Sequence, residues 1–369
     1  MNKIKVMPIF GTRPEAIKMA PVVKALKKEE NIDCTLTVTA QHREMLDQVL
    51  DLFNLSPDHD LDIMEDEQSL TGITARILKK LAGVYKEEKP DLILVHGDTS
   101  TTFVASLAAY YQQIAVGHVE AGLRTGNKYS PFPEEMNRHL TGVIADLHFA
   151  PTAASKENLL KENVPAEKIT VTGNTVIDAL LETIDPDYSF EHPVLKNIDF
   201  EEERIILLTA HRRENLGEPM ENIFAAISDI LEQSKDTEVV YPVHLNPKIK
   251  KLAQKHFGEN QRVHLIEPLD YEPFVNLMNK SYLVLTDSGG IQEEAPSLGK
   301  PVLVLRDTTE RPEAVEAGTV KKVGTDQMRI VESTLKLLKD EESYKEMSAS
   351  SNPYGDGRAS ERIVKELLT

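Results

Sequence analysis

The chain has 369 residues, a length that suits two or three domains of about 150 residues each. It carries 42 Lys and Arg against 60 Asp and Glu, a formal net charge of −18, and this negative field disfavours nucleic acid and anionic lipid as partners. The single cysteine, Cys34, excludes an internal disulfide, and no apolar run approaches the length of a membrane span. We therefore expect a cytoplasmic protein with no membrane or nucleic-acid partner. A small anionic ligand stays compatible, because a few local cations can override the net field inside a cleft.

Short apolar, β-branched runs alternate with longer segments in which apolar residues recur every three or four positions. The runs in the first half of the chain are residues 6–10, 35–39, 92–95, 115–119, 147–150 and 169–172. Those in the second half are residues 205–210, 239–243, 263–266, 283–286 and 302–305. This alternation of strands and helices predicts an α/β protein with parallel sheets covered by helices.

The two series of strands predict two doubly wound, Rossmann-like domains. A segment rich in Pro, Asp and Glu at residues 185–203 lies between the series and is typical of a loop or linker. We expect an N-terminal domain at 1–170 and a C-terminal domain at 171–355, with a late helix at about 356–369 that joins the first domain. Ligands of open parallel sheets bind beyond the carboxyl ends of the strands, so functional residues are expected in the loops that follow them.

The loop at residues 11–18, Gly-Thr-Arg-Pro-Glu-Ala-Ile-Lys, is typical of a glycine turn that opens into a helix. Arg13 and Lys18 are cations near the start of that helix, where the helix dipole disfavours positive charge. A bound anion would explain them, and simple capping with solvated charges is the alternative. The motif is neither Gly-x-Gly-x-x-Gly nor a Walker A loop.

The loop at residues 288–294, Ser-Gly-Gly-Ile-Gln-Glu-Glu, also follows a predicted strand and opens a helix. Its backbone N–H groups and its small hydroxyl could cradle a pyrophosphate, and Glu294 could accept hydrogen bonds from ribose hydroxyls. A glycine turn followed by an acidic pair that the helix dipole favours is the alternative.

Asp98, Glu120 and Glu134 lie at or shortly after predicted strand ends. Carboxylates that meet in one cleft raise one another's pKa and supply acid and base forms near neutral pH, although each one alone is best explained as a solvated surface residue. His211 follows another strand and precedes two arginines, so it could bind phosphate or move protons, and a structural histidine is the alternative. No metal-ligand spacing is present, and no metal site is expected.

Taken together, these loops resemble the non-hydrolysing UDP-N-acetylglucosamine 2-epimerases of bacteria and archaea, from about residue 6 to residue 311. The matching segments are 10–21 (FGTRPEAIKMAP), 39–46 (TAQHREML), 95–99 (VHGDT), 117–125 (GHVEAGLRT), 172–178 (TGNTVID), 288–296 (SGGIQEEAP) and 306–313 (RDTTERPE). The resemblance implies the GT-B architecture, in which two Rossmann-like domains flank a deep cleft, and it implies a homodimer.

The resemblance also implies an activity, the reversible epimerisation of UDP-N-acetylglucosamine to UDP-N-acetylmannosamine for cell-surface polysaccharide synthesis. In this route UDP is eliminated to leave a 2-acetamidoglucal, and UDP then adds back while a proton reaches the opposite face of C2. No nicotinamide, metal or other cofactor is required.

The resemblance assigns roles to residues of this sequence. The acid/base candidates are Asp98, which ranks first, Glu120 and Glu134, with Arg138 orienting them and His211 as a further catalytic group. Phe274 would lie by the uracil. The residues implied at the substrate are Arg13, Lys18, Asp98, Glu120, His211, Phe274, Ser288, Gly289, Gly290, Glu294 and Arg311.

Some bacterial members bind a second UDP-N-acetylglucosamine as an allosteric activator. The residues that match that pocket are Gln41, Glu134, Arg212 and His244. Glu44 and Glu67 are acidic where a neutral or basic side chain is expected, which would weaken a site for an anionic effector.

Three alternative functions stay open. A hydrolysing epimerase would let water reach the glucal and would release UDP and free N-acetylmannosamine. A GT-B glycosyltransferase would use the same UDP cradle with an acceptor and would exchange no C2 proton. A non-catalytic nucleotide-sugar sensor would bind without exchange, and the joint presence of Asp98, Glu120 and Glu134 argues against it.

Overall fold

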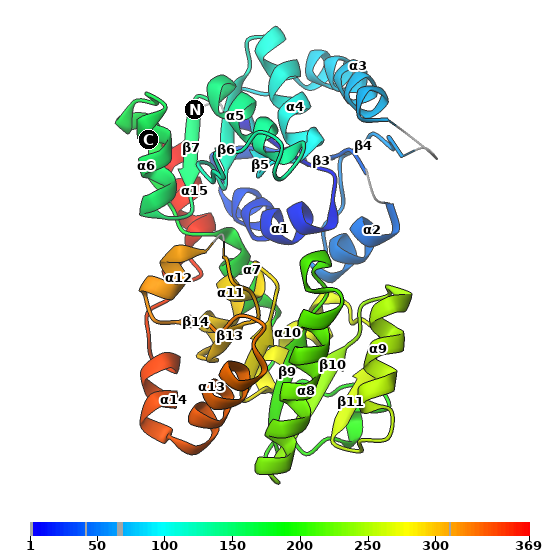
Figure 1. Ribbon diagram of the computed structural model, residues 1–369. Helices are drawn as coiled ribbons and strands as arrows, with labels where there is room; N and C mark the ends of the chain where they lie inside the picture. Colours follow the sequence, from blue (N-terminus) through cyan, green and yellow to red (C-terminus); the bar gives the residue numbers. More distant parts are fainter. Residues whose placement is uncertain (1–2, 41–42, 65–68, 310) are drawn as a thin grey trace. The chain divides into compact units, whose positions relative to one another are not determined.

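The computed structural model describes residues 3–40, 43–64, 69–309 and 311–369. The chain divides into two compact units, of which unit 1 comprises Met1–Leu181 and Tyr354–Thr369 and unit 2 comprises Glu182–Pro353 (Figure 1). Within the described ranges, every helix is too short or too polar to cross a membrane.

Unit 1 is built around a parallel sheet whose strand order is β4-β3-β1-β5-β6-β7-β8, with β2 paired to β1. Its strands are β1 (Ile4–Phe10), β2 (Ile32–Cys34), β3 (Thr37–Val38), β4 (His59–Asp60), β5 (Leu92–His96), β6 (Ala115–Val119), β7 (Leu147–Ala150) and β8 (Ile169–Val171). Its helices are α1 (Arg13–Lys28), α2 (Arg43–Leu52), α3 (Leu70–Glu88), α4 (Ser100–Tyr111), α5 (Glu134–Ile144), α6 (Ala153–Lys161), α7 (Thr175–Thr183) and α15 (Ala359–Leu367).

Unit 2 repeats this plan with a parallel sheet in the order β11-β10-β9-β12-β13-β14. Its strands are β9 (Arg204–Thr209), β10 (Thr237–Pro242), β11 (Val263–Ile266), β12 (Leu283–Thr286), β13 (Val302–Val304) and β14 (Val320–Lys322). Its helices are α8 (Glu218–Gln233), α9 (Pro247–Phe257), α10 (Tyr271–Lys280), α11 (Ile291–Glu294), α12 (Pro312–Glu316), α13 (Gln327–Lys339) and α14 (Glu341–Ser348). Short 3-10 turns are η1 (Ala166–Lys168) in unit 1 and η2 (Leu195–Asn197), η3 (Arg213–Asn215) and η4 (Ala295–Leu298) in unit 2.

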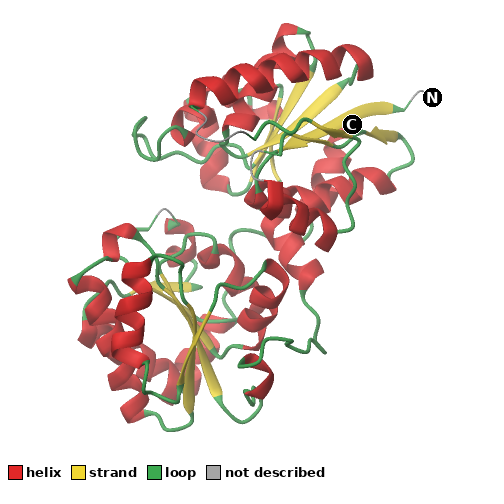
Figure 2. Cartoon of the chain, turned by 90° about the vertical axis from the view of Figure 1, so that its right-hand side faces the viewer, coloured by secondary structure: helices red, strands yellow, loops and turns green. Residues whose placement is uncertain are grey.

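Burial explains why the central strands are near-continuous apolar runs. All five residues of β5 are buried, as are the last five of both β1 and β9, because helices cover both faces of each sheet (Figure 2). The helices that cover them present an apolar stripe, as α3 does with Ile73, Ile77 and Leu81. These two helix-covered parallel sheets confirm the predicted α/β class.

The sequence did not predict three of the strands, namely β2, β4 and β14. Each lies outside the central positions of its sheet and is only two or three residues long. β4 reads His-Asp and β14 reads Val-Lys-Lys, so neither has an apolar run for the sequence to reveal. Polar, short edge strands of this kind also discourage pairing with other chains.

The expected division of the chain differs from the observed one at residues 171–181 and 354–355, which lie in unit 1 rather than in unit 2. Their bonds to the C-terminal segment give the physical reason. Asn174 N–H donates to the Tyr354 carbonyl at 2.7 Å, and the Asp178 carboxylate accepts the Ala359 and Ser360 N–H groups at 3.1 and 2.7 Å. α15 itself packs against α1.

Candidate active site

Each sheet has a switch point where neighbouring strands lead their helices to opposite faces, between β1 and β5 in unit 1 and between β9 and β12 in unit 2. Ligands of doubly wound sheets bind beyond the carboxyl ends of the strands at such points. The loops that follow these four strands begin at Gly11, Gly97, Ala210 and Asp287. Arg13, Asp98, His211, Arg212 and the loop at residues 288–290 lie in or next to these four loops, whereas Glu120 follows β6 and Glu134 and Arg138 lie on α5.

In unit 1, the carboxylate of Glu15 ties the first loop to the second. Its Oε2 accepts the N–H groups of Gly11 and Thr12 at 3.1 and 2.9 Å, and its Oε1 accepts the hydroxyl of Thr99 at 2.7 Å. Burial raises the pKa of Glu15, and these hydrogen bonds oppose the rise. Gly11 is required by close approach, since a Cβ there would lie 2.0 Å from Thr39 Oγ1.

Asp98 is held on several sides. Arg138 donates from Nη2 and Nε to Asp98 Oδ2 at 2.6 and 3.0 Å, and Asn137 Nδ2 donates to the Asp98 backbone carbonyl at 2.8 Å. The preceding residue, Gly97, has φ +67°, and its carbonyl accepts a hydrogen bond from His118 Nε2 at 2.7 Å. The Asp98 carboxylate is thus preorganised and partly exposed, as a proton-transfer group must be.

Glu120 has a different environment from Asp98. It adopts φ +61°, a left-handed conformation that is uncommon outside glycine and asparagine. Its Oε1 forms an ion pair with Lys18 and accepts a hydrogen bond from Asn174 Nδ2 at 2.9 Å. Its Oε2 lies 3.5 Å from His96 Nε2. Lys18 therefore contacts a carboxylate directly, although the sequence suggested an anionic ligand for it.

Glu134 begins α5, and its Oε2 is buried without a hydrogen-bond partner among the described residues. Arg138 does not donate to it, but to its neighbour Glu135 at 2.9 Å. Glu135 is 1% exposed and also accepts the N–H groups of Thr125 and Gly126. Arg138 thus orients Asp98 in this structure, and the expectation that it orients all three acids finds no contact to Glu134 or Glu120.

In unit 2, Asp287 organises the loop that carries His211. Asp287 is fully buried, and its Oδ2 accepts the N–H groups of His211 and Arg212 at 2.9 and 2.8 Å. Its Oδ1 lies 3.1 Å from His211 Nδ1 but makes no hydrogen bond to it or to any other described residue. Burial lowers the pKa of His211, while the Asp287 charge opposes this and Arg212 and His244 add to it. The rings of His211 and His244 stack with an interplanar angle of 8°.

A cavity of about 220 Å³ opens beside His211, and its lining combines apolar surface with a few ring nitrogens and hydroxyls. The lining residues are Thr209, Ala210, His211, Pro242, His244, Pro268, Leu269, Phe274 and Ile291. This combination suits a flat heterocycle, and it brings the predicted Phe274 and His211 to one cavity.

The loop after β12 carries the predicted pyrophosphate residues. Ser288 and Gly289 follow Asp287, and Gly290 precedes α11 with φ −63°, so no left-handed conformation requires it. Glu294 accepts a hydrogen bond from the Tyr271 hydroxyl at 3.2 Å, and Arg311 forms an ion pair with Glu293. The arrangement can present backbone N–H groups and one cation to an anion.

Comparison with known proteins decides the family. A family model described as UDP-N-acetylglucosamine 2-epimerase matches residues 24–368 of the chain. The chain belongs to the UDP-N-acetylglucosamine 2-epimerase family. It is 65% identical to the Bacillus subtilis UDP-N-acetylglucosamine 2-epimerase over 368 residues, which cover 100% of this chain and 96% of that protein.

Solved structures agree with this assignment. One UDP-N-acetylglucosamine 2-epimerase matches with a TM-score of 0.93 and 62% identity, covering 100% of this chain and 96% of its own. The Neisseria meningitidis UDP-GlcNAc 2-epimerase bound to UDP-GlcNAc matches with a TM-score of 0.87 and 54% identity, covering 99% of this chain and 100% of its own. The predicted GT-B class and the epimerase family are confirmed, while the role of each site residue stays a prediction.

The residues that match the activator pocket lie in both units, and one of them is outside the described residues. Arg212 and His244 adjoin His211 in unit 2, and Glu134 lies in unit 1. Gln41 lies outside the described residues.

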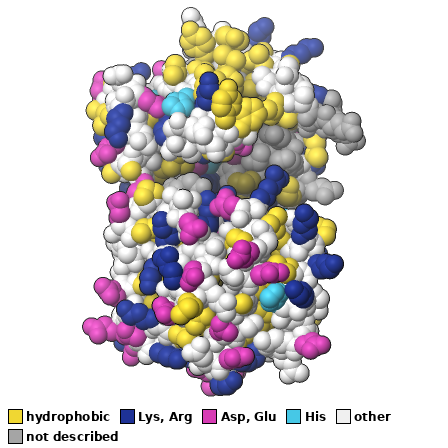
Figure 3. Space-filling view, viewed as in Figure 1, with side chains coloured by type: hydrophobic (Ala, Val, Ile, Leu, Met, Phe, Trp, Pro, Cys, Tyr) yellow, Lys and Arg dark blue, Asp and Glu magenta, His cyan; other side chains and the backbone are white. Residues whose placement is uncertain are grey.

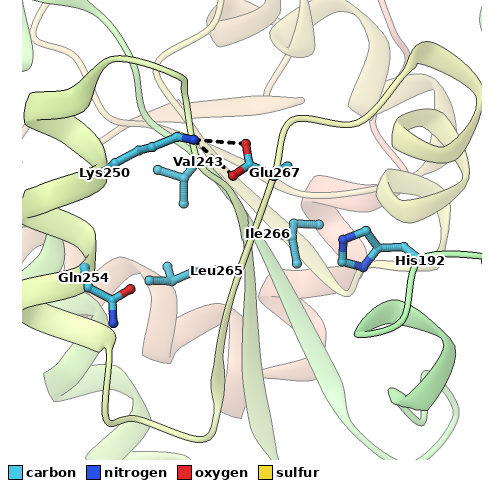
Figure 4. A pocket seen from close by; sticks show the side chains of 7 residues that line it. All are labelled: His192, Val243, Lys250, Gln254, Leu265, Ile266 and Glu267. Atoms are coloured by element: carbon cyan, nitrogen blue, oxygen red, sulfur yellow. Dashed lines mark hydrogen bonds and ion pairs between the residues drawn. The ribbon is translucent and has the colours of Figure 1, made fainter.

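Unit 2 contains a further cavity of about 310 Å³ that none of the predicted residues line. Lys250 Nζ and Glu267 Oε1 form an ion pair there at 3.0 Å (Figure 4). The lining residues are His192, Val243, Lys250, Gln254, Leu265, Ile266 and Glu267. Lys250 is thus paired with a carboxylate of the same wall.

The sequence assigned no site role to four residues that shape these loops, namely Glu15, His96, Asn174 and Asp287, and favoured a packing role for His96. Asp287 carried a signal, because it is the first residue after a buried strand. Glu15 carried another, because it is at the third helical position after Thr12, where a capping box places a glutamate. Asn174 is 54 positions from Glu120, and only the fold brings the two together.

Proposed function

We propose that the chain interconverts UDP-N-acetylglucosamine and UDP-N-acetylmannosamine without hydrolysis, by elimination and re-addition of UDP at C1. The observation that carries this mechanism is the pair of carboxyl groups in unit 1 with unlike surroundings. Asp98 is held by Arg138, whereas Glu120 lies against Lys18, Asn174 and His96. Two differently held carboxyl groups suit a reaction that removes a proton from one face of C2 and delivers one to the other.

The elimination can be written with these groups. A carboxylate takes the C2 proton, the electrons of the C2–H bond form the C1=C2 bond of the glucal, and the electrons of the C1–O bond leave with UDP. Asp98 ranks first as this base because its side chain is partly exposed and Arg138 fixes its geometry. Re-addition reverses the electron flow and delivers a proton to the opposite face of C2.

Unit 2 supplies groups for the departing nucleotide. The cavity beside His211 and Phe274 suits the uracil, and Ser288, Gly289 and Gly290 suit the pyrophosphate. His211, whose Nδ1 lies 3.1 Å from the Asp287 carboxylate, can become protonated as negative charge develops on UDP. Arg13, at the start of α1 in unit 1, makes no ion pair with another described residue.

The assembly that we propose is a cytoplasmic homodimer in which the two units act as the two domains of one enzyme. Hydrophobic side chains gather on the surface of α4 and α5 (Figure 3). Among them, Tyr110 and Tyr111 are 64% and 65% exposed, and Val143 is 86% exposed. α4 and α5 pack together, so their exposed apolar residues form one patch, which is typical of a protein interface.

Proton NMR with UDP-N-acetylglucosamine in D₂O tests the proposed function. We expect deuterium at C2 and a new anomeric signal from UDP-N-acetylmannosamine, without free sugar. Free N-acetylmannosamine and UDP would instead indicate a hydrolysing epimerase. Binding without exchange at C2 would contradict the proposal and would favour a sensor or a transferase.

A further inference from the structure

His96, the last residue of β5, is a buried imidazole that lies against Glu120. The residue is 3% exposed. Its Nε2 has no hydrogen-bond partner among the described residues. A lone pair at Nε2 requires the neutral tautomer that carries its proton on Nδ1.

Burial keeps this imidazole neutral. Burial lowers the pKa of His96 to about 4. The Glu120 charge opposes this shift, and the Lys18 charge adds to it. The titratable or charged groups that face the ring are Glu120, Lys18 on α1 and His118 on β6. Burial also lowers the pKa of His118, to about 3, so His118 brings no charge near neutral pH. The His96 ring is therefore neutral near neutral pH.

The two oxygens of Glu120 have opposite surroundings. Oε1 meets donors, the Lys18 ammonium and the Asn174 amide, whereas Oε2 lies 3.5 Å from the bare His96 Nε2. When Glu120 is ionised, two acceptors face each other across this gap. When Oε2 is protonated, its O–H can donate to Nε2, and the buried nitrogen gains the partner that it otherwise lacks.

We propose that His96 is a positioning residue that holds the proton of Glu120 on Oε2 by accepting a hydrogen bond at Nε2. The inference rests on the proposed function, in which one carboxyl group carries a proton at the glucal stage. Delivery of that proton forms the C2–H bond from the C1=C2 electron pair, C1 takes an oxygen of UDP, and Glu120 returns to its ionised form. His96 keeps its own proton throughout and touches no substrate atom in this step.

Two substitutions separate this role from simple packing. His96→Phe fills similar volume without an acceptor, and His96→Gln retains a side-chain oxygen that can accept. We expect His96→Phe to lower kcat by about tenfold or more with KM and UDP affinity changed less than about twofold. The alkaline limb of its kcat–pH profile should move to lower pH, because the protonated form of Glu120 has lost its acceptor. His96→Gln should restore most of kcat and the position of that limb.

His148→Gln is the matched control, because His148 is equally buried and is paired with His118 on the neighbouring strand rather than placed against Glu120. It should leave the pH profile unchanged. Equal losses in the Phe and Gln variants of His96, or a Phe variant with the unmodified profile, would overturn the inference. If the unmodified protein does not exchange C2, both the proposed function and this inference fail, whereas normal exchange with unaltered variants overturns the inference alone.

A measurement on the unmodified protein covers the case in which His96→Phe does not fold. Nitrogen-15 NMR of histidine-labelled protein distinguishes protonated from unprotonated ring nitrogens. We expect the His96 signals to report a proton on Nδ1 and none on Nε2 between pH 6 and 8, with assignment from the His96→Gln spectrum. A proton on Nε2 in that range would contradict the inference, because the nitrogen could not then accept from Glu120.

Discussion

At the scale of single residues, Asp98 owes its geometry to Arg138 and Asn137 rather than to burial, since its side chain is 28% exposed. Asp98→Asn keeps an oxygen that Arg138 can reach but removes the ability to take a proton. We expect kcat to fall by about 10²–10⁴ with little change in KM, because the loss falls on proton transfer. Initial rates with UDP-N-acetylglucosamine check this. Asp51→Asn, on the exposed surface of α2, is the control, and an Asp98→Asn variant with normal kcat would exclude Asp98 as the base.

Burial lowers the pKa of His211, and the Asp287 carboxylate lies 3.1 Å from its Nδ1. It is therefore largely neutral in the free protein and should gain a proton when the pyrophosphate of UDP arrives. Calorimetry of UDP binding at pH 7.5, in buffers of different ionisation enthalpy, should show uptake of up to one proton. His211→Asn should remove this uptake and weaken binding. His264→Asn, on the β11 edge strand, should retain it, and an unchanged uptake in His211→Asn would assign the proton to another group.

At the scale of secondary-structure elements, α15 depends on a residue far away in the sequence. Asp178 on α7 accepts the N–H groups of Ala359 and Ser360, the first two residues of α15. Asp178→Ala leaves these buried N–H groups without an acceptor, at a cost of about 1–3 kcal/mol. A fall of several degrees in Tm is expected from thermal unfolding of the purified protein.

The control for this change is Glu361→Gln, which removes only an exposed ion pair with Arg358. It should leave the Tm unchanged, because exposed ion pairs contribute little. Equal Tm values for Asp178→Ala and the unmodified protein would show that α15 is held by its packing against α1 alone.

At the scale of the whole molecule, the apolar patch on α4 and α5 predicts self-association. The double substitution Tyr111→Glu and Val143→Lys introduces two charges where two copies would exclude water, at positions 65% and 86% exposed. Sedimentation should give the mass of a dimer for the unmodified chain and of a monomer for this variant, with unchanged circular dichroism. Met328→Lys, an equally exposed apolar position on α13, should leave the dimer intact. A dimer that survives the double substitution would move the interface elsewhere.

The α/β class, the central strands and the loops of the candidate site could all be predicted from the sequence. The physical reason is local, because strands buried on both faces must be near-continuous apolar runs and polar residues directly after them reach the carboxyl edge of a parallel sheet. Short strands such as β4 and β14 were beyond this reasoning, since two or three polar residues leave no periodic signal.

The partners of each site residue, in contrast, could not be predicted from the sequence and depend on the fold. Arg138 meets Asp98 across 40 positions, Asn174 meets Glu120 across 54, and Asp287 meets His211 across 76. Hydrogen bonds and ion pairs act over about 3 Å, and strand order sets which loops come within that distance. The order places β1 beside β5 and β9 beside β12, although other strands lie between them in the sequence. The sequence therefore predicted which acidic, basic and histidine side chains belong to the site, while the contacts between them depended on the order of the strands.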